Sequence, residues 1–120
     1  MGKENYKSAG VDIDAGNEVV HRIKDSVKST FTSSVLTGLG GFGSLYDLKP
    51  ILENYNNPVM VQSIDGVGTK TIIARKLGKF DTIGVDLLSA AVNDILVLGA
   101  RPLTFLDYIA NDRLKPVILE

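Results

Sequence analysis

The stretch Val-Met-Val-Gln-Ser-Ile-Asp-Gly-Val-Gly-Thr-Lys at residues 59–70 decides how the rest of the chain is interpreted. Its first residues favour a β-strand that ends at Asp65, and the glycines that follow predict a flexible turn before a helix begins near Thr69 and Lys70. A carboxylate can bind a divalent cation, while glycine amides, a lysine and a helix N-terminus can bind phosphate. Two interpretations are open at this point: an anion or metal site, or an ordinary strand-to-helix turn with a solvated aspartate.

A second glycine-rich stretch, Gly-Leu-Gly-Gly-Phe-Gly at residues 38–43, matches the Gly-x-Gly-x-x-Gly dinucleotide fingerprint. We interpret this match as fortuitous, because the fingerprint requires a helix directly after the glycines and Pro50 falls where that helix would continue. The segment before the glycines is also a poor buried strand. The run favours either a mobile flap whose amides wrap a phosphate chain or a plain surface loop.

Length and composition limit the class of protein. The 120 residues, of which 44% are hydrophobic, predict one domain over residues 1–120 with enough apolar side chains to bury a core. Thirteen basic and 14 acidic residues leave a net charge of -1, which argues against a field that attracts nucleic acid or an anionic membrane. The absence of cysteine excludes disulfides and thiolate metal sites. Without a signal peptide or membrane-spanning pattern, we expect a cytoplasmic protein.

Apolar residues recur at helical spacing in several parts of the chain. The predicted helices cover residues 15–28, 69–77, 83–98 and 114–120. Asp12 or Asp14 can cap the first of these helices, and Gly78 ends the second. A second strand is predicted from Leu103 to Ala110, and Pro50 is expected to break a short helical turn between residues 44 and 52.

The helix predicted over residues 83–98 carries polar side chains within a wide apolar face. Asp86 and Asn93 are seven residues apart and share one side of the helix, separated by about 10.5 Å, while Asp94 lies at the edge of that side. An unpaired buried carboxylate costs several kcal/mol. Each aspartate therefore faces solvent or is compensated by a cation, and the sequence leaves both possibilities open.

Six motifs in this order resemble the phosphoribosylformylglycinamidine cyclo-ligase family, also called aminoimidazole ribonucleotide synthetase. They are Tyr-Lys-Ser-Ala-Gly-Val-Asp-Ile-Asp-Ala-Gly at 6–16, Gly-Leu-Gly-Gly-Phe-Gly at 38–43, Asp-Gly-Val-Gly-Thr-Lys at 65–70, Gly-Val-Asp-Leu at 84–87, Val-Asn-Asp at 92–94 and Phe-Leu-Asp-Tyr at 105–108. The resemblance implies the N-terminal, ATP-binding domain of a two-domain enzyme. Its implied fold is α+β, with a mixed sheet that packs on helices and pairs with a second copy in a homodimer.

The reaction implied by the resemblance is the ATP-dependent ring closure of formylglycinamidine ribonucleotide to aminoimidazole ribonucleotide, with ADP and phosphate as the other products. This is a carbon–nitrogen ligase reaction of purine biosynthesis. Because the second domain is expected to share the substrate site, the 120-residue chain alone is expected to be incomplete as an enzyme. Two alternatives are a related phosphoryl-transfer domain of selenophosphate or thiamin phosphate type, and a non-catalytic nucleotide-binding dimerisation module.

The resemblance also implies roles for individual residues, with ATP and Mg²⁺ as cofactors. Asp65 and Asp94 resemble the magnesium ligands. The residues that resemble the ATP and phosphate site are Gly38, Gly40, Gly41, Gly43, Gly66, Gly68, Thr69, Lys70 and Asn93. The catalytic groups are not identified, and Lys7, Asp86 and Asp107 have no assigned role. The chain departs from the family pattern at Ser8, where Asp is common, and at Ile64, where Thr is common.

Overall fold

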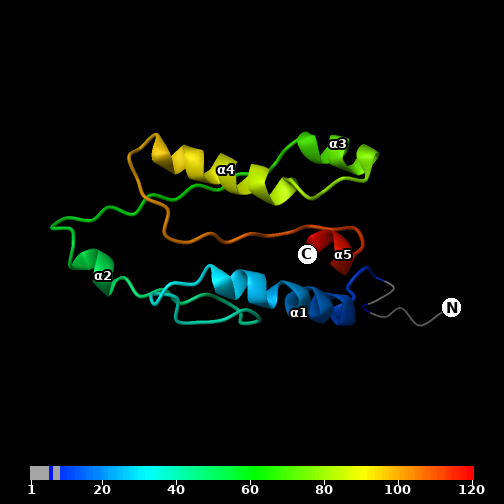
Figure 1. Cartoon of the computed structure of the whole chain (residues 1–120), viewed down its shortest axis with the longest axis horizontal. Helices are drawn as coiled ribbons and strands as arrows, with labels where there is room; N and C mark the ends of the chain where they lie inside the picture. Colours follow the sequence, from blue (N-terminus) through cyan, green and yellow to red (C-terminus); the bar gives the residue numbers. More distant parts are fainter. Residues whose placement is uncertain (1–5, 7–8) are drawn as a thin grey trace. The chain divides into compact units, whose positions relative to one another are not determined.

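A computed structural model of the chain describes residue 6 and residues 9–120 (Figure 1). Lys7 and Ser8 lie outside the described residues. The chain divides into two units, the first formed by Met1–Pro58 together with Ala110–Glu120, and the second by Val59–Ile109. Each unit is described by itself below.

Helix α1 (Ile13–Ser29) is the longest element of the first unit. Asp12 caps it, because one carboxylate oxygen accepts a hydrogen bond of 3.1 Å from the backbone N–H of Ala15. Val19, Ile23 and Val27 are half-buried at three- and four-residue spacing, so they form the apolar stripe of an amphipathic helix. The helix predicted over residues 15–28 is confirmed, with two residues more at its N-terminus and one more at its C-terminus.

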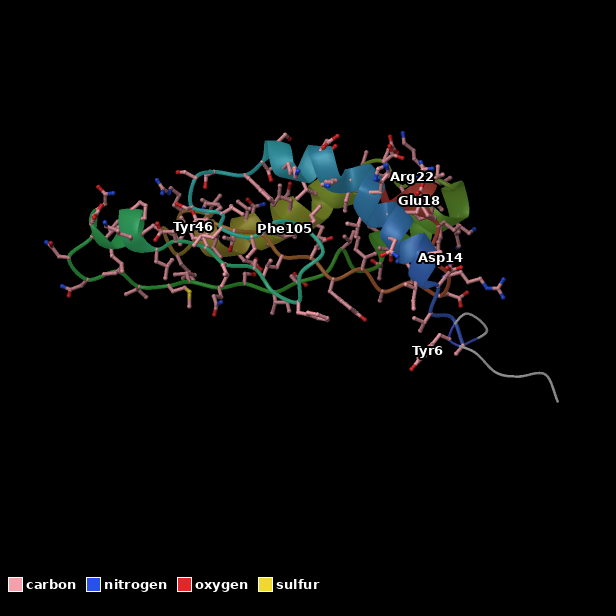
Figure 2. All side chains as sticks on the ribbon, turned by 90° about the horizontal axis from the view of Figure 1, so that it is seen from below. Tyr6, Asp14, Glu18, Arg22, Tyr46 and Phe105 are labelled. Atoms are coloured by element: carbon pink, nitrogen blue, oxygen red, sulfur yellow. The ribbon has the colours of Figure 1, made fainter. Side chains whose placement is uncertain are left out.

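Helix α5 (Pro116–Leu119) contacts α1 within the same unit. Arg22 on α1 connects the two elements, because its guanidinium lies 2.7 Å from Glu18 on α1 and 2.9 Å from Glu120 directly after α5. Figure 2 shows Glu18 and Arg22 together on the side of α1 next to α5. The hydrogen bond with Glu120, and after it that with Glu18, raises the pKa of Arg22 above its ordinary value.

The glycine-rich stretch at residues 38–43 lies between two segments that pair with each other. Val35 and Tyr46 form an antiparallel bridge, supported by backbone hydrogen bonds from Leu36 to Leu45 (2.9 Å) and from Asp47 to Ser34 (2.8 Å). The glycines are thus the connection of a short hairpin, and no helix starts from them. This agrees with our rejection of the dinucleotide fingerprint.

Pro50 lies inside a helix, contrary to the expectation that it would break one. Helix α2 (Lys49–Leu52) has this proline in its first turn. The prediction was wrong because the first N–H groups of a helix have no partner within the helix, so that a proline there removes no hydrogen bond.

In the second unit, helix α3 (Lys70–Leu77) is followed by helix α4 (Ile83–Leu96) (Figure 1). Gly78 ends α3 in the left-handed region, with φ 63°, and the next N–H bonds back to the carbonyl of Ala74 at 3.0 Å. Both predicted helices are confirmed. Ala74, at 6% exposure, is the only buried hydrophobic residue among those described.

The two segments predicted as β-strands, at residues 59–64 and 103–110, are not assigned as strands. Both segments are extended and contain neither helix nor turn (Figure 1). Among the described residues, the only β-type pairing is the Val35–Tyr46 bridge in the first unit. A strand exists only where a neighbouring segment accepts and donates its backbone hydrogen bonds. No backbone hydrogen bond joins either segment to another described residue. The mixed sheet therefore stays a prediction.

Helix α4 is the most apolar helix of the second unit. Its side chains at positions 87, 91 and 95 are half-buried, whereas Leu88 and Leu96 are about half exposed. Over residue 6 and residues 9–120, no helix has both the length and the apolar character that crossing a bilayer requires.

Candidate metal and phosphate site

Asp65 lies at the corner between the extended segment at residues 59–64 and α3, as the sequence predicts. One oxygen of its carboxylate accepts a hydrogen bond of 2.7 Å from the N–H of Gly66, the next residue. Gly68 adopts φ 71°, a conformation that residues with a side chain rarely occupy, and its carbonyl accepts a hydrogen bond of 2.8 Å from the Thr71 hydroxyl. The glycines thus permit a tight corner that exposes the carboxylate to solvent.

Asp94 lies beside the segment that leads to this corner. The hydroxyl of Ser63 donates a hydrogen bond of 2.8 Å to one carboxylate oxygen of Asp94, although the two residues are 31 positions apart. Ser63 precedes Asp65 by two residues, and side chains two positions apart in extended chain lie on the same side. The structure therefore brings α4, which carries one predicted metal ligand, to the chain that presents the other.

Lys70 and Asp86 form an ion pair that the sequence analysis did not anticipate. Lys70 is the first residue of α3, and Asp86 lies in the first turn of α4. The Asp86 oxygen that contacts the lysine ammonium is shielded from solvent, while the two side chains as a whole are 30% and 53% exposed, respectively. Of the two possibilities left open for this aspartate, compensation by a cation is thus the one observed, and the cation is Lys70.

Among residue 6 and residues 9–120, the side chains of Thr69 and Asn93 make no hydrogen bond or ion pair that indicates a role for them. Thr69 precedes α3 without a capping hydrogen bond from its side chain. Asn93 is exposed, and its carbonyl accepts the N–H of Val97 at 3.3 Å. The glycines at 38–43 belong to the first unit, whereas residues 65–70, 93 and 94 belong to the second. The roles predicted for these glycines, for Thr69 and for Asn93 therefore stay predictions.

Ser63 is a partner of the predicted metal ligand Asp94 that sequence reasoning missed. The signal was present, because a hydroxyl two residues before a candidate metal ligand lies on the same side of an extended chain. Its partner on α4 could not be identified from spacing along the chain, since the hydrogen bond joins residues from different elements.

Carboxylate oxygens of the kind that Asp65 and Asp94 supply suit a hard cation bound together with a nucleotide. Within the described residues, no three His, Cys, Asp or Glu side chains form a cluster that could hold a metal by themselves. Mg²⁺ is commonly held by only one or two carboxylates, and phosphate oxygens and water complete its coordination. Two aspartates are enough for such a site, and the assignment of Asp65 and Asp94 as its ligands stays a prediction.

A shallow, open hollow on α3 is a poorer candidate for the site. It is lined by Ile72, Arg75 and Lys76, all from one helix, and it includes none of the predicted site residues. Ligand sites are usually enclosed by several elements with convergent polar groups.

Comparison with known proteins identifies the family. Residues 50–120 match the family model described as AIR synthase related protein, N-terminal domain. The chain belongs to this family. The matched region contains α3, α4 and both predicted metal ligands, so the resemblance recognised in the sequence is confirmed.

Similar members of the family carry the name phosphoribosylformylglycinamidine cyclo-ligase. The protein of Carboxydothermus hydrogenoformans is 56% identical over 116 residues, which is 97% of this chain and 33% of that relative. The proteins of Thermoanaerobacter pseudethanolicus and Xanthomonas campestris pv. campestris (strain B100) are 55% and 56% identical, over 92% and 91% of this chain and 32% and 31% of theirs. The chain thus spans about a third of the length of these curated relatives.

Proposed function

We propose that this chain is the ATP-binding part of a cyclo-ligase that closes the imidazole ring of formylglycinamidine ribonucleotide to give aminoimidazole ribonucleotide. The observation that carries the site assignment is the Ser63–Asp94 hydrogen bond, which holds the helix of one proposed metal ligand against the chain that leads to the other. The names of the relatives support the reaction. They give no support to the selenophosphate and thiamin phosphate alternatives.

The proposed chemistry has two bond exchanges. The terminal phosphoryl group of ATP passes to the formyl amide oxygen of the substrate, which breaks its bond to ADP and turns that oxygen into a leaving group. An internal nitrogen of the substrate then attacks the activated carbon, so that a carbon–nitrogen bond forms as the carbon–oxygen bond to phosphate breaks. The positioning of the phosphates and the neutralisation of their charge are the contributions that this chain can make.

We propose Asp65 and Asp94 as the ligands of Mg²⁺, which when bound neutralises negative charge on the nucleotide phosphates. Lys70 and the backbone N–H groups near Gly66 and Gly68 are proposed to bind phosphate oxygens, because an ammonium and the amides of a helix N-terminus both attract anions. On binding, the Gly66 N–H would exchange its hydrogen bond to Asp65, and Lys70 its contact with Asp86, for phosphate oxygens. Thr69, Asn93 and the glycines of residues 38–43 belong to the same proposal and rest on the resemblance alone.

We also propose that the chain adopts the α+β fold of the family, with a mixed sheet that packs on helices and pairs with a second copy in a homodimer. The extended segments at residues 59–64 and 103–110 support this proposal. Their backbone groups form no hydrogen bond with another described residue, and their side chains are mostly exposed. An unpaired extended segment is a ready template for another strand.

Calorimetric titration with Mg²⁺-ATP tests the proposed site. We expect the chain to bind this complex, and we expect Asp65→Asn and Asp94→Asn each to weaken binding by at least about tenfold, because losing groups around a metal typically costs that much. Asp25→Asn is the matched control, since Asp25 is an exposed aspartate on α1 in the other unit. Unchanged affinity in both site variants would disprove the ligand assignment.

A further inference from the structure

The two oxygens of the Asp94 carboxylate have different surroundings. One of them, Oδ2, accepts the 2.8 Å hydrogen bond from the Ser63 hydroxyl, while the other, Oδ1, has no hydrogen-bond partner among the described residues. A carboxylate with one oxygen held in this way has its orientation restricted by the donor. It presents its second oxygen as the better electron-pair donor.

This asymmetry matters because the two common divalent cations use carboxylates differently. Ca²⁺ accepts about six to eight oxygen ligands in flexible geometry and often takes both oxygens of one carboxylate. Mg²⁺ requires near-octahedral geometry at about 2.0–2.1 Å, which suits a single oxygen from each carboxylate. A hydrogen bond on Oδ2 therefore costs a bidentate Ca²⁺ complex more than a monodentate Mg²⁺ complex.

We propose that Ser63 is a specificity-determining residue of the metal site, which holds Asp94 for contact through one oxygen and so favours Mg²⁺ over Ca²⁺. This inference rests on the proposed function, because it assumes that Asp94 binds the metal of the nucleotide complex. Ser63 acts through Asp94 and is a positioning residue. Ser63 lies in the extended segment two residues before Asp65. The same short stretch of chain would therefore supply one metal ligand, Asp65, and orient the other, Asp94.

The test is a pair of calorimetric titrations of the chain with a non-hydrolysable ATP analogue, one in excess Mg²⁺ and one in excess Ca²⁺. The quantity of interest is the ratio of the two dissociation constants. We expect the unmodified chain to bind the Mg²⁺ complex more tightly, and Ser63→Ala to reduce this preference by about two- to tenfold, as the loss of one hydrogen bond predicts. Most of the change should come from tighter binding of the Ca²⁺ complex.

Two further variants separate orientation of Asp94 from a general effect on folding. Ser63→Thr keeps a hydroxyl on the same carbon and should retain the preference for Mg²⁺. Ser89→Ala removes an exposed hydroxyl from α4 and should leave both dissociation constants unchanged. Circular dichroism spectra that match the unmodified chain would show that the variants are folded.

The possible failures are distinguishable. If Asp94→Asn abolishes binding while Ser63→Ala leaves the Mg²⁺ to Ca²⁺ ratio unchanged, the inference about Ser63 is wrong and the proposed function stands. If Asp94→Asn and Asp65→Asn bind both complexes as the unmodified chain does, the metal assignment itself is wrong, and the inference falls with it.

Discussion

Asp86, to which the sequence analysis assigned no role, forms an ion pair with Lys70 in the structure. Its carboxylate contacts the Lys70 ammonium with one oxygen shielded from water, so removing the charge leaves a cation beside an amide that satisfies it poorly. We expect Asp86→Asn to lower the free energy of unfolding by about 1 kcal/mol, a modest value because both side chains remain partly exposed. Urea denaturation followed by circular dichroism measures this change.

A double-mutant cycle checks that this loss belongs to the pair. Once Lys70→Met has removed the ammonium, Asp86→Asn should cost less than it does alone, with a coupling of roughly 0.5 kcal/mol or more. Strictly additive effects of the two substitutions would contradict the ion pair as a source of stability.

At the scale of elements, two glycines provide a matched comparison of backbone conformation. Gly78 ends α3 with φ 63°, whereas Gly84 lies inside α4 without a positive φ, and an added methyl group meets no atom within 4 Å at either position. We expect Gly78→Ala to lower the free energy of unfolding by about 1 kcal/mol, because alanine is strained in the left-handed region. Gly84→Ala should raise it by about 0.5–1 kcal/mol, because alanine is the better helix former. Thermal or urea denaturation of both variants measures these changes. Equal changes in the free energy of unfolding would show that the backbone conformation of the two glycines does not set the sign of the effect.

Arg22 links α1 to the end of the chain beside α5, because it forms ion pairs with Glu18 and Glu120. We expect Arg22→Met to speed hydrogen exchange of the backbone amides in α5. Lys24→Met should not, because it removes an exposed cation that has no ion pair with another described residue. Because the pKa of Arg22 is raised in the folded chain, its contribution is fully present below the ordinary arginine pKa and is lost only as the pH rises through the higher folded value. Exchange rates corrected for intrinsic chemistry should therefore show no loss attributable to Arg22 between neutral and mildly alkaline pH.

At the scale of the whole molecule, the extended segments at residues 59–64 and 103–110 expose apolar side chains that a partner could cover. Val59, Ile64 and Tyr108 are 86%, 99% and 92% exposed. Exposed apolar groups on unpaired chain favour association. We expect sedimentation experiments to show that the chain self-associates as its concentration rises, and we expect the double variant Val59→Lys, Ile64→Lys to weaken this association.

Leu77→Lys is the control for that experiment, since Leu77 is an apolar residue of α3 that is also largely exposed, at 71%. It should leave the association unchanged. A purely monomeric chain at all accessible concentrations would count against the proposed homodimer.

Features that depend on neighbouring residues were predictable from the sequence. The ranges of α1, α3 and α4, the cap at Asp12 and the end of α3 at Gly78 agree with prediction, because helical hydrogen bonds and their caps join residues that are close in the chain. The corner at Asp65 belongs to the same class, since its hydrogen bonds stay within a few residues. Pro50 was misjudged because the same residue starts or breaks a helix according to where the helix begins.

The partners of the site residues were decided only by the tertiary structure. Ser63 donates a hydrogen bond to Asp94, 31 positions away, and Lys70 on α3 forms an ion pair with Asp86 on α4. No local sequence pattern predicts either pairing. For the same reason the sheet could not be read from two strand-like stretches, because a strand also needs a second segment to complete its hydrogen bonds. The sequence by itself determined which residues carry the charges and the helical faces, while the folded chain determined which of those charges stand next to one another.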